Sequence, residues 1–493
     1  MNSFSHYLKK VGEVGEVRQS FGQVAYASGL PGARLGEMVL FETGQKGKIL
    51  SLEEDFLKLL VFDPEPVAVG ARVARTGQGL KVPVGKELLG RVVDSFCQPL
   101  YTTGKYRPPG DFYEVDADPW GIEGRVRVSK SLETGVAVVD LLIPLGKGQR
   151  ELVIGDRKVG KTAFILQTIL HQSPKGTVCI YAGIAKRASE IKRIEEFFKK
   201  RGVMEKIVII TSGPQESAGI VYLTPYTAMA VAEYFRDNGD DVLVVLDDLS
   251  YHARFYREIA LAARFFPGRD SYPVDIFYTH GKLLERAGNF KTPKGEASIT
   301  ALAVAETNQR DLSGYIQTNI MSMTDGHIFF DADLYGQGRR PAINPFLSVT
   351  RVGRQAQTPL FREAGRELLS FLTTYEKMRS FIHFGAEVTD QVKQILAKGE
   401  LITHFFDQRE NQIIDSSVQI FVLGILWVDF LAKGEKEKTK EEVNNLISLL
   451  EKDQKLRKKV AVLVKEANSF AELLSLISAK GIKMLQGSGK QLK

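Results

Sequence analysis

Hydrophobic and polar residues alternate along the first 80 residues of the chain, in short runs that glycines separate. Such runs lie at 15–18, 22–26, 37–41 and 48–52. A period of two residues with closely spaced turns is typical of half-buried β-strands. The pattern predicts a small β-barrel or sandwich over residues 1–80, and nothing in it suggests chemistry. We expect this domain to be a scaffold.

The pattern changes after residue 80. Residues 83–125 are rich in proline and glycine, and beyond them short apolar runs alternate with helical spacing. Strands are predicted at 151–155, 178–182, 207–211, 242–246 and 274–278, and helices at 188–201 and 226–237. This alternation predicts a doubly wound, mostly parallel α/β sheet over residues 81–355.

After residue 355 the strand pattern stops and apolar residues recur at helical spacing. Helices are predicted at 367–382, 390–396, 418–432 and 441–466, with an exposed Lys/Glu-rich link at 434–442. Residues 356–493 are therefore predicted to form a C-terminal helical bundle.

One octapeptide, GDRKVGKT, joins the first predicted strand of the α/β region to the helix that follows it. It satisfies the phosphate-loop pattern G-x-x-x-x-G-K-[ST], and the flanking strand and helix argue against a chance match. Glycines allow the backbone N–H groups to turn toward phosphate oxygens, the lysine reaches the β- and γ-phosphates, and the threonine hydroxyl binds Mg²⁺. The predicted nucleotide-binding residues are Gly155, Asp156, Arg157, Lys158, Val159, Gly160, Lys161 and Thr162.

An apolar strand at 242–246 ends in Asp247 and Asp248. A carboxylate at the end of such a strand can hold the water shell of Mg²⁺ in a phosphate-loop site. Acidic residues often follow strands without such a role, but the phosphate loop upstream favours it here. Asp247 is assigned to the metal, and Asp248 is expected to make a structural hydrogen bond.

Composition places few further limits on function. At 493 residues the chain is long enough for about three domains. Its two cysteines, Cys97 and Cys179, are isolated and are interpreted as core residues. Of the net charge of +7, an excess of 6 lies between Lys433 and Lys493, where 14 Lys/Arg face 8 Asp/Glu. A solvated helix surface explains this excess better than contact with an acidic partner or anionic lipid.

The N-terminus, MNSFSHYLKK, lacks the apolar core of a signal peptide. The most apolar stretch, residues 420–428, is too short to span a bilayer. Neither a signal peptide nor a transmembrane segment is therefore expected.

Several longer motifs carry a resemblance to a known family. They are PLGKGQREL at 144–152, the phosphate loop, DDLS at 247–250, PGRDSYP at 267–273, LLERA at 283–287, PAINP at 341–345 and SVTRVG at 348–353. In this order and spacing they resemble the alpha subunit of the rotary F-type ATP synthase over almost the whole chain. The resemblance implies a RecA-like P-loop domain between the barrel and the helical bundle.

The resemblance also implies partners and a division of labour. Alpha subunits of that family alternate with beta subunits in a hexameric ring around a gamma stalk, on the cytoplasmic side of the bacterial membrane. They bind Mg-ATP or ADP without turnover, while the beta sites synthesise and hydrolyse ATP, coupled to H⁺ or Na⁺ flow. The N-terminus before the first strand is short, so contact with the family's peripheral stalk stays open.

Three residues take family roles through matching motifs. Arg351 matches the arginine finger that reaches the γ-phosphate in the neighbouring beta site, although an arginine in such a segment is more often an ordinary surface residue. Ser348 matches a position linked to activity. Gln408 matches one of two glutamines beside the adenine.

The chain departs from the family pattern at several positions. Ala185 stands where alpha chains usually have glutamine and catalytic chains have a glutamate that polarises water, so this chain's own site is expected to be non-catalytic. Lys158 and Val159 replace glutamine and threonine in the phosphate loop, and Glu410 replaces the second adenine-side glutamine.

Two other readings stay open. One is a subunit of a specialised ATPase ring that is not coupled to a membrane rotor. The other is a homohexameric ATPase of the secretion or Rho type, against which the missing glutamate argues. Residues 1–80 have no basic patch interleaved with aromatics, so no nucleic-acid partner is expected.

Overall fold

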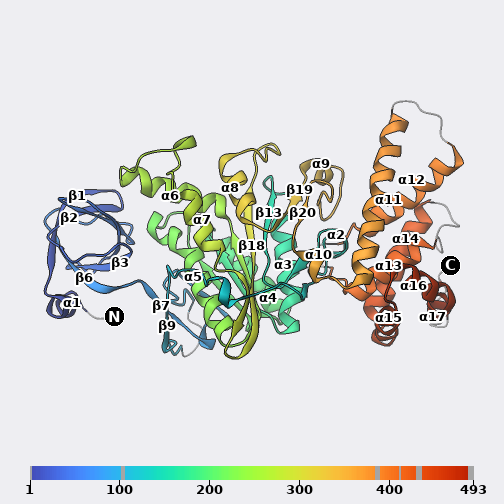
Figure 1. The fold of residues 1–493 in the computed structure, drawn as a ribbon, viewed down its shortest axis with the longest axis horizontal. Helices are drawn as coiled ribbons and strands as arrows, with labels where there is room; N and C mark the ends of the chain where they lie inside the picture. The colour runs from blue at the N-terminus through green and yellow to red at the C-terminus, as the bar shows by residue number, and fades with distance from the viewer. Residues whose placement is uncertain (1–2, 102–105, 384–388, 410–411, 429–435, 487–493) are drawn as a thin grey trace. The chain divides into compact units, whose positions relative to one another are not determined.

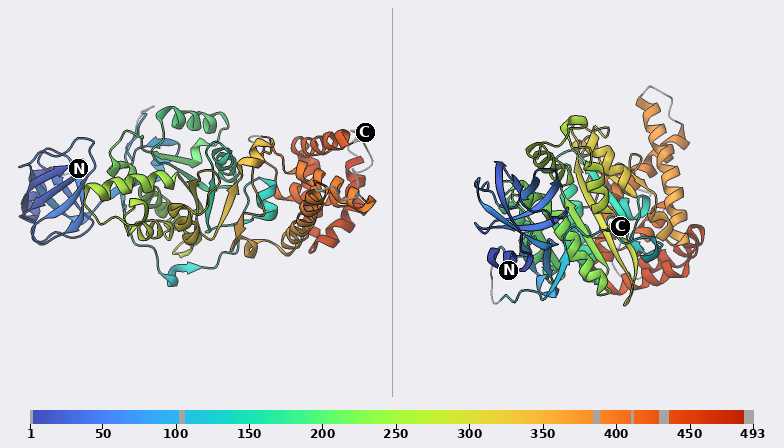
Figure 2. Two further views of the ribbon diagram at one scale, coloured as in Figure 1. Left: turned by 90° about the horizontal axis from the view of Figure 1, so that it is seen from above. Right: turned by 60° about the vertical axis from the view of Figure 1, so that its left-hand side comes forward.

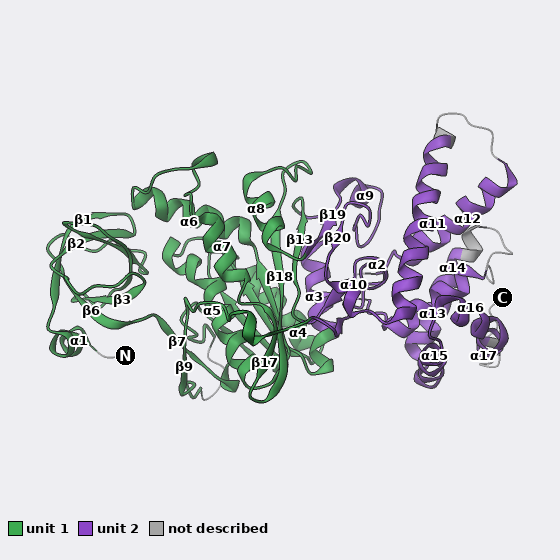
Figure 3. Ribbon diagram, in the orientation of Figure 1, with its two compact units in different colours: residues 1–127, 148–157, 172–325 green, residues 128–147, 158–171, 326–493 purple. Residues whose placement is uncertain are grey.

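The computed structural model of the chain describes residues 3–101, 106–383, 389–409, 412–428 and 436–486. These residues form two compact units (Figure 3). The first contains residues 1–127, 148–157 and 172–325, and the second contains residues 128–147, 158–171 and 326–493. The domain boundaries after residues 80 and 355 stay a prediction.

A closed six-stranded barrel begins the first unit (Figures 1 and 2). Its strands pair in the order β1-β2-β5-β4-β3-β6, and β6 returns to β1. Alternate residues such as Val17, Val39, Ile49 and Leu59 are fully buried in its interior. The barrel predicted from the alternating pattern is thereby confirmed. The elements are α1 (Phe4–Val11), β1 (Val14–Phe21), β2 (Val24–Ser28), β3 (Glu37–Phe41), β4 (Lys46–Leu52), β5 (Leu57–Val61) and β6 (Arg72–Gly79).

A mostly parallel sheet forms the rest of the first unit, as predicted. Strands β13, β18, β16, β14, β15 and β8 lie side by side in this order, and neighbouring members are parallel. A hairpin partner, β17, runs antiparallel to β18. The strands are β7 (Lys81–Val84), β8 (Arg91–Val93), β9 (Asp111–Glu114), β10 (Arg125–Val126), β13 (Arg150–Gly155), β14 (Val178–Gly183), β15 (Ile207–Thr211), β16 (Val242–Asp247), β17 (Gly288–Thr292) and β18 (Gly295–Glu306).

The helices of the first unit cover this sheet, with α5 against β14, β16 and β18 (Figure 1). They are α4 (Ala188–Lys200), α5 (Ala218–Asp237), α6 (Leu249–Ala262), α7 (Ile276–Leu284) and α8 (Tyr315–Met323), with 3₁₀ turns at Lys86–Leu88, Ile122–Gly124, Ser173–Lys175, Met204–Lys206 and Arg269–Ser271.

The strand predicted at 274–278 is wrong, because this segment opens helix α7. Buried residues of α7 recur at Ile276, Thr279, His280 and Leu283, which is the spacing of one helix face. The five-residue run was too short to reveal that period.

The register of the parallel strands brings several chain segments to one edge. Gly155, the last residue of β13, pairs with Glu306, the last residue of β18. Gly183 at the end of β14 pairs with Asp247 at the end of β16. Loops that leave these strands therefore meet at the carboxyl edge of the sheet, where ligands bind in open α/β folds.

The second unit contains two short antiparallel strand pairs, β11 with β12 and β19 with β20, and the helices of the C-terminal region. The predicted C-terminal helical region is confirmed. Its elements are β11 (Ser131–Leu132), α2 (Ala137–Leu142), β12 (Leu145–Gly146), α3 (Lys161–Gln172), β19 (Gly326–Phe330), α9 (Ala332–Gly336), β20 (Val349–Thr350), α10 (Gly353–Ala356), α11 (Pro359–His383), α12 (Asp390–Phe405), α13 (Ser416–Trp427), α14 (Lys436–Lys452), α15 (Gln454–Glu466), α16 (Phe470–Leu476), a π-helical turn (Ile477–Gly481) and α17 (Ile482–Gln486).

Several helix limits differ from the prediction. The helix predicted at 441–466 is two helices, because Asp453 caps α15 by accepting the N–H groups of Lys455 and Leu456. Helix α14 begins at Lys436, within the predicted link, and α12 extends to Phe405. Residues 429–432 of the predicted third helix lie outside the described part of the chain. Over the described residues, no helix has the length and apolar character needed to cross a bilayer.

Candidate functional site

The phosphate-loop sequence connects β13 to α3, so the strand–loop–helix arrangement that it requires is present. Gly155 and Gly160 adopt φ values of 158° and 100°, a region that favours glycine. Lys158 also has a positive φ, of 63°, which is uncommon for a residue with a Cβ. These values give the loop a curled backbone at both glycines.

The first residues of the loop are fixed to the carboxyl edge of the sheet. Asp156 accepts a hydrogen bond from the hydroxyl of Thr307 at 2.5 Å. The Nε of Arg157 lies 2.6 Å from a carboxylate oxygen of Glu306, and its Nη2 donates to the hydroxyl of Tyr251 at 2.9 Å. These contacts hold the start of the loop against the end of β18 and the first turn of α6.

The remaining residues of the loop differ in exposure. Val159 and Lys161 are buried, Thr162 is half-buried in the first turn of α3, and Lys158 is exposed. A helix start with a lysine and a hydroxyl residue is what the predicted phosphate and metal contacts need. The roles assigned to these residues stay predictions.

Asp247 ends β16 as predicted, and its buried carboxylate is already engaged on both oxygens. Oδ2 accepts a hydrogen bond from the hydroxyl of Tyr181 at 2.7 Å. Oδ1 lies 2.9 Å from the ammonium Nζ of Lys186. The backbone oxygen of Asp247 accepts the N–H of Ile184 at 2.7 Å, so the segment after β14 lies directly beside this aspartate.

Sequence reasoning selected Ala185 at this point and missed its neighbour Lys186. Ala185 adopts a left-handed φ of 53°, and its N–H donates to the hydroxyl of Ser212 at 3.3 Å. The N–H of Lys186 donates to the backbone oxygen of Ser212 at 2.9 Å. The available signal was a lysine just beyond the end of one strand and an aspartate at the end of another, but only the strand register shows that they meet.

Asp248 makes the structural hydrogen bond that was expected of it. Its Oδ1 accepts the N–H of Ser250 at 2.6 Å and caps the start of α6. Burial, followed by the charges of Asp247 and Glu306, raises the pKa of Asp248 to about 7. Of the two aspartates, Asp247 is the one that forms the ion pair with Lys186.

The fit of this edge to Mg²⁺ can be judged from Asp247 itself. Carboxylates are suitable ligands for Mg²⁺ or for its bound water. Here a lysine ammonium stands at one oxygen and a phenol at the other, so a metal ion at Oδ1 would have to displace Lys186. Within the described ranges, no group of three or more His, Cys, Asp or Glu side chains is placed to hold a metal.

Arg351 lies in the turn between β20 and α10 in the second unit. Its side chain is exposed and has no hydrogen-bond or ion-pair partner among the residues that the structure describes. The turn around it is fixed by Pro144, whose backbone oxygen accepts the hydroxyl of Thr350 at 2.9 Å. A Cβ on Gly353 would lie 1.6 Å from the same oxygen, so only glycine fits there. A turn that these contacts hold against Pro144 thus presents an exposed guanidinium.

Ser348 supports the segment that leads to this turn. Its hydroxyl donates to the backbone oxygen of Asn344 at 2.7 Å and accepts the N–H of Phe329 at 2.9 Å. Both contacts are within the second unit, and they join β19 to the chain just before β20. The side chain therefore positions the backbone here.

Gln408 is buried, and its amide contacts the chain before α2. Its Oε1 accepts the N–H of Ala137 at 2.6 Å, and its Nε2 donates to the backbone oxygen of Gly135 at 3.0 Å. Its predicted contact with adenine stays a prediction, and Glu410 lies outside the described residues. A cleft of about 310 Å³ in the same unit is lined by residues that include Pro341, Ile343, Phe346 and Phe406.

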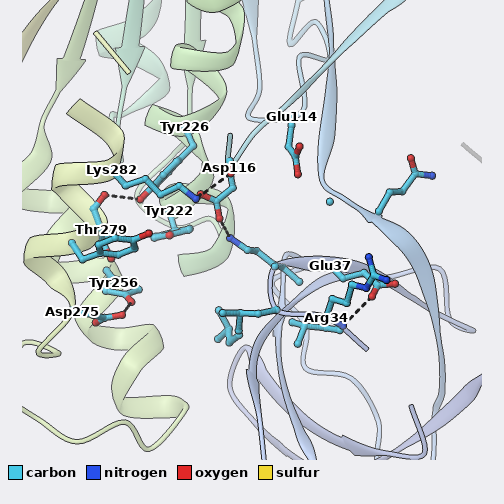
Figure 4. A pocket seen from close by; sticks show the side chains of 18 of the residues that line it. Arg34, Glu37, Glu114, Asp116, Tyr222, Tyr226, Tyr256, Asp275, Thr279 and Lys282 are labelled. Carbon is cyan, nitrogen blue, oxygen red and sulfur yellow. Dashed lines mark hydrogen bonds and ion pairs between the residues drawn. The ribbon is translucent and has the colours of Figure 1, made fainter. Parts of the chain in front are cut away.

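A separate polar cleft of about 440 Å³ lies between the barrel and the helices of the first unit (Figure 4). Asp116 joins its walls, because it pairs with Lys48 of β4 at 2.5 Å and with Lys282 of α7 at 3.1 Å. Tyr222 and Tyr256 also line it. None of the predicted nucleotide-binding residues lines this cleft, and its ion pairs tie the barrel to the α/β sheet.

Comparison with known families gives two matches along the chain. Residues 135–350 match the ATP synthase alpha/beta family, nucleotide-binding domain. Residues 357–475 match the ATP synthase alpha/beta chain, C terminal domain. Together they include the phosphate loop, Asp247, Ser348 and Gln408, and Arg351 is the first residue after the first match.

Curated relatives match over most of the chain. A protein named ATP synthase subunit alpha from Caldanaerobacter subterraneus subsp. tengcongensis is 40% identical over 441 residues, covering 89% of this chain and 87% of the relative. Proteins of the same name from Orientia tsutsugamushi (strain Ikeda) and Neorickettsia sennetsu are 36% identical over 495 residues and 38% identical over 421 residues. They cover 99% and 83% of this chain, and 95% and 82% of the relatives.

Proposed function

The chain belongs to the family of ATP synthase alpha subunits, and from this membership we propose that it holds a nucleotide without turning it over. ATP or ADP binds at Gly155–Thr162, with Thr162 and Asp247 as the residues for Mg²⁺, the latter through water. When bound, the metal neutralises charge on the phosphates. The apolar cleft near Gln408 supports a place for the base.

The position of Lys186 carries the proposal that this site is non-catalytic. Hydrolysis needs a group that orients or deprotonates the attacking water beside the metal-binding aspartate. Beside Asp247, the segment that follows β14 places the ammonium of Lys186, at 2.9 Å, and β14 itself places the phenol of Tyr181, at 2.7 Å. An ammonium cannot act as a base, and its neighbour Ala185 has no polar side-chain atom.

The chemical contribution of this chain is then made in a neighbouring site. Arg351 is exposed, carries a permanent charge and sits in a turn that is held against Pro144. A planar guanidinium stabilises charge on phosphoryl oxygens well. We propose that Arg351 reaches the γ-phosphate bound by an adjacent beta subunit, and that Ser348 positions it.

Assembly follows from the same membership. Beta subunits alternate with this chain in a six-membered ring around a gamma stalk, and the ring lies at the cytoplasmic face of a bacterial membrane. ATP synthesis or hydrolysis in the beta sites is coupled to transport of H⁺ or Na⁺. A ring built this way needs two different faces on each subunit, and one of them carries Arg351.

Binding and turnover of ATP by the purified full-length chain test the proposal. We expect the chain to bind ATP in the presence of Mg²⁺ and to release no phosphate above background. Lys161→Ala should remove the binding. Robust hydrolysis by the chain alone would overturn the proposal.

A further inference from the structure

We propose that a basic groove in the second unit docks an acidic amphipathic helix of a partner protein. The groove has a volume of about 350 Å³ and lies between α15 and the segment that ends in α17 (Figure 1). None of the predicted nucleotide-binding residues lines it, so its occupant is separate from the nucleotide. Its lining includes Lys458, Lys459, Val462, Glu466, Lys480 and Met484.

One face of α15 supplies the first wall of the basic groove. Lys455, Lys458, Lys459 and Val462 are exposed and follow one another at the spacing i, i+3, i+4 and i+7. This spacing places them on one side of a helix, while residues such as Leu456 are buried on another side. The lysines therefore surround an exposed valine.

The π-helical turn Ile477–Gly481 and α17 supply the second wall. Lys480 of this turn lies 3.2 Å from a carboxylate oxygen of Glu466, and this ion pair joins the two walls at the end of α15. A π-helical turn is rare and is frequently found at functional sites. The family match ends at residue 475, so this wall lies beyond the matched residues. Membership of the family therefore does not predict the groove.

The charge around the basic groove selects an acidic occupant. Residues 454–486 contain seven Lys/Arg and two Asp/Glu, an excess of 5 positive charges. Neither Lys458 nor Lys459 has an ion-pair partner among the residues that the structure describes. Both ammonium groups are therefore available to carboxylates of another molecule.

An apolar floor distinguishes the basic groove from an ordinary solvated helix surface. Val462 is 58% exposed, and Leu463 and Met484 line the groove with it. The aliphatic stems of the flanking lysines extend this apolar surface, while their charges stay in water. A partner helix can fill the floor with apolar side chains that recur every three or four residues, and acidic residues beside them then face the lysines. A solvated surface explains the charges but not the apolar floor between them.

An anionic membrane surface fits the basic groove less well than a helix does. Helices that lie on a membrane project large apolar side chains into the boundary of the acyl chains. Here Leu463 is buried and forms part of a hollow between two walls. Such a hollow receives side chains from a ridge, and a helix presents one.

Fluorescence anisotropy of a labelled synthetic peptide mixed with the full-length chain tests this inference. The peptide has about 18 residues, with leucine at every third or fourth position and glutamate or alanine at the others. We expect a Kd of about 10–100 µM in dilute salt, and a rise of at least about tenfold in about 1 M salt, which screens the attraction. A peptide of the same composition with its leucines on all sides should bind at least about tenfold more weakly. If the amphipathic peptide did not bind at about 1 mM, the inference would be overturned.

Variants of the exposed lining residues locate the bound peptide. Val462→Asp and the double variant Lys458→Glu/Lys459→Glu should each raise its Kd by at least about tenfold. These side chains are exposed, so the variants should fold, and circular dichroism checks this. Lys9→Glu/Lys10→Glu is the matched control, because it reverses an exposed lysine pair of α1, outside the groove, and its Kd should stay within about twofold of wild type. Equal Kd values for the groove variants and the wild type would place the peptide elsewhere and overturn the inference.

Sedimentation with vesicles of phosphatidylglycerol and phosphatidylcholine tests the membrane as the occupant. We expect the two groove variants to lose peptide binding with no matching loss of vesicle binding. Loss of vesicle binding in these variants, with peptide binding unaffected, would assign the basic groove to a membrane surface and overturn the proposed helix partner.

Discussion

Arg286 and Glu233 form a bidentate ion pair in the interior of the first unit. The Nε of Arg286 lies 2.9 Å from Oε1 of Glu233, and its Nη2 lies 2.6 Å from Oε2. Arg286 also donates from Nη1 to the backbone oxygen of Val115 at 2.6 Å. The ion pair joins α5, which carries Glu233, to the segment just after α7, which carries Arg286. Through Val115, Arg286 also contacts the residue that follows β9.

We expect Arg286→Met to lower the free energy of unfolding by about 3–5 kcal/mol, because it leaves Glu233 charged and buried without a partner. Urea denaturation of the purified chain measures this loss. The exposed pair of Arg18 and Glu16, at 3.2 Å, gives a matched control, and Arg18→Met should cost less than about 1 kcal/mol. If both variants lost a similar amount of unfolding free energy, burial of the Arg286–Glu233 pair would not explain its effect on stability.

Arg351→Ala should reduce ATP turnover of the ring assembled with beta and gamma subunits by about 10³- to 10⁵-fold, the range for an arginine finger. The reason is loss of charge stabilisation at the neighbouring γ-phosphate. Steady-state phosphate release measures turnover, and dialysis measures ATP binding to the isolated variant, which should match that of the wild-type chain.

Arg354, an exposed arginine three residues further along the chain, in α10, is the control for Arg351. Arg354→Ala should leave turnover within a few-fold of wild type, since surface arginines away from a site contribute little. Retained turnover in the assembled Arg351→Ala ring would remove the finger assignment.

His252 and His280 form a buried neutral pair beside the tyrosines of α5. Nδ1 of His252 lies 3.0 Å from Nε2 of His280, and its Nε2 lies 3.1 Å from the backbone oxygen of Tyr222. Burial lowers the pKa of His252 to about 4, and burial with the neighbouring His252 lowers the pKa of His280. The unfolded chain therefore binds more protons than the folded chain between about pH 4 and pH 6.5.

Stability should accordingly fall as the pH drops below about 6.5, by about 2 kcal/mol from His252 alone between about pH 7 and pH 5. His252→Gln removes that titration while keeping a donor for Tyr222. Urea denaturation at both pH values measures the slopes, and the variant should lose less stability on acidification than the wild type. If the wild type and the variant lost equal stability on acidification, titration of His252 would not contribute to the pH dependence of stability.

Regular patterns predicted much of the fold. Alternating residues in the first 80 positions predicted the barrel, and the strand–helix alternation predicted the parallel sheet. The segment 274–278 was wrongly predicted as a strand, because five residues are too few to distinguish the two-residue period of a strand from the 3.6-residue period of a helix. The buried face of helix α7 becomes visible only when later residues, such as Leu283, are included. Asp453 ended a helix within a continuous helical pattern, since a single capping residue outweighed the period.

In the candidate site, too, local sequence motifs could be predicted and contacts between distant residues could not. The phosphate loop and Asp247 are local motifs, and each sits on the elements that its sequence predicted. Lys186 could not be found locally, because its partner lies 61 positions further along the chain and they meet only through the pairing of Gly183 with Asp247. Contacts that depend on strand register are visible only in three dimensions.

Closure of the N-terminal barrel has a consequence for assembly. Each of its six strands has a hydrogen-bonded neighbour on both sides, because β6 pairs with β1. A neighbouring polypeptide therefore has no unpaired strand edge to extend, and strand addition and the aggregation that follows it are blocked. If this barrel contacts another protein, the two must recognise each other through side chains, so partner choice there is set by surface chemistry and can change without altering the backbone.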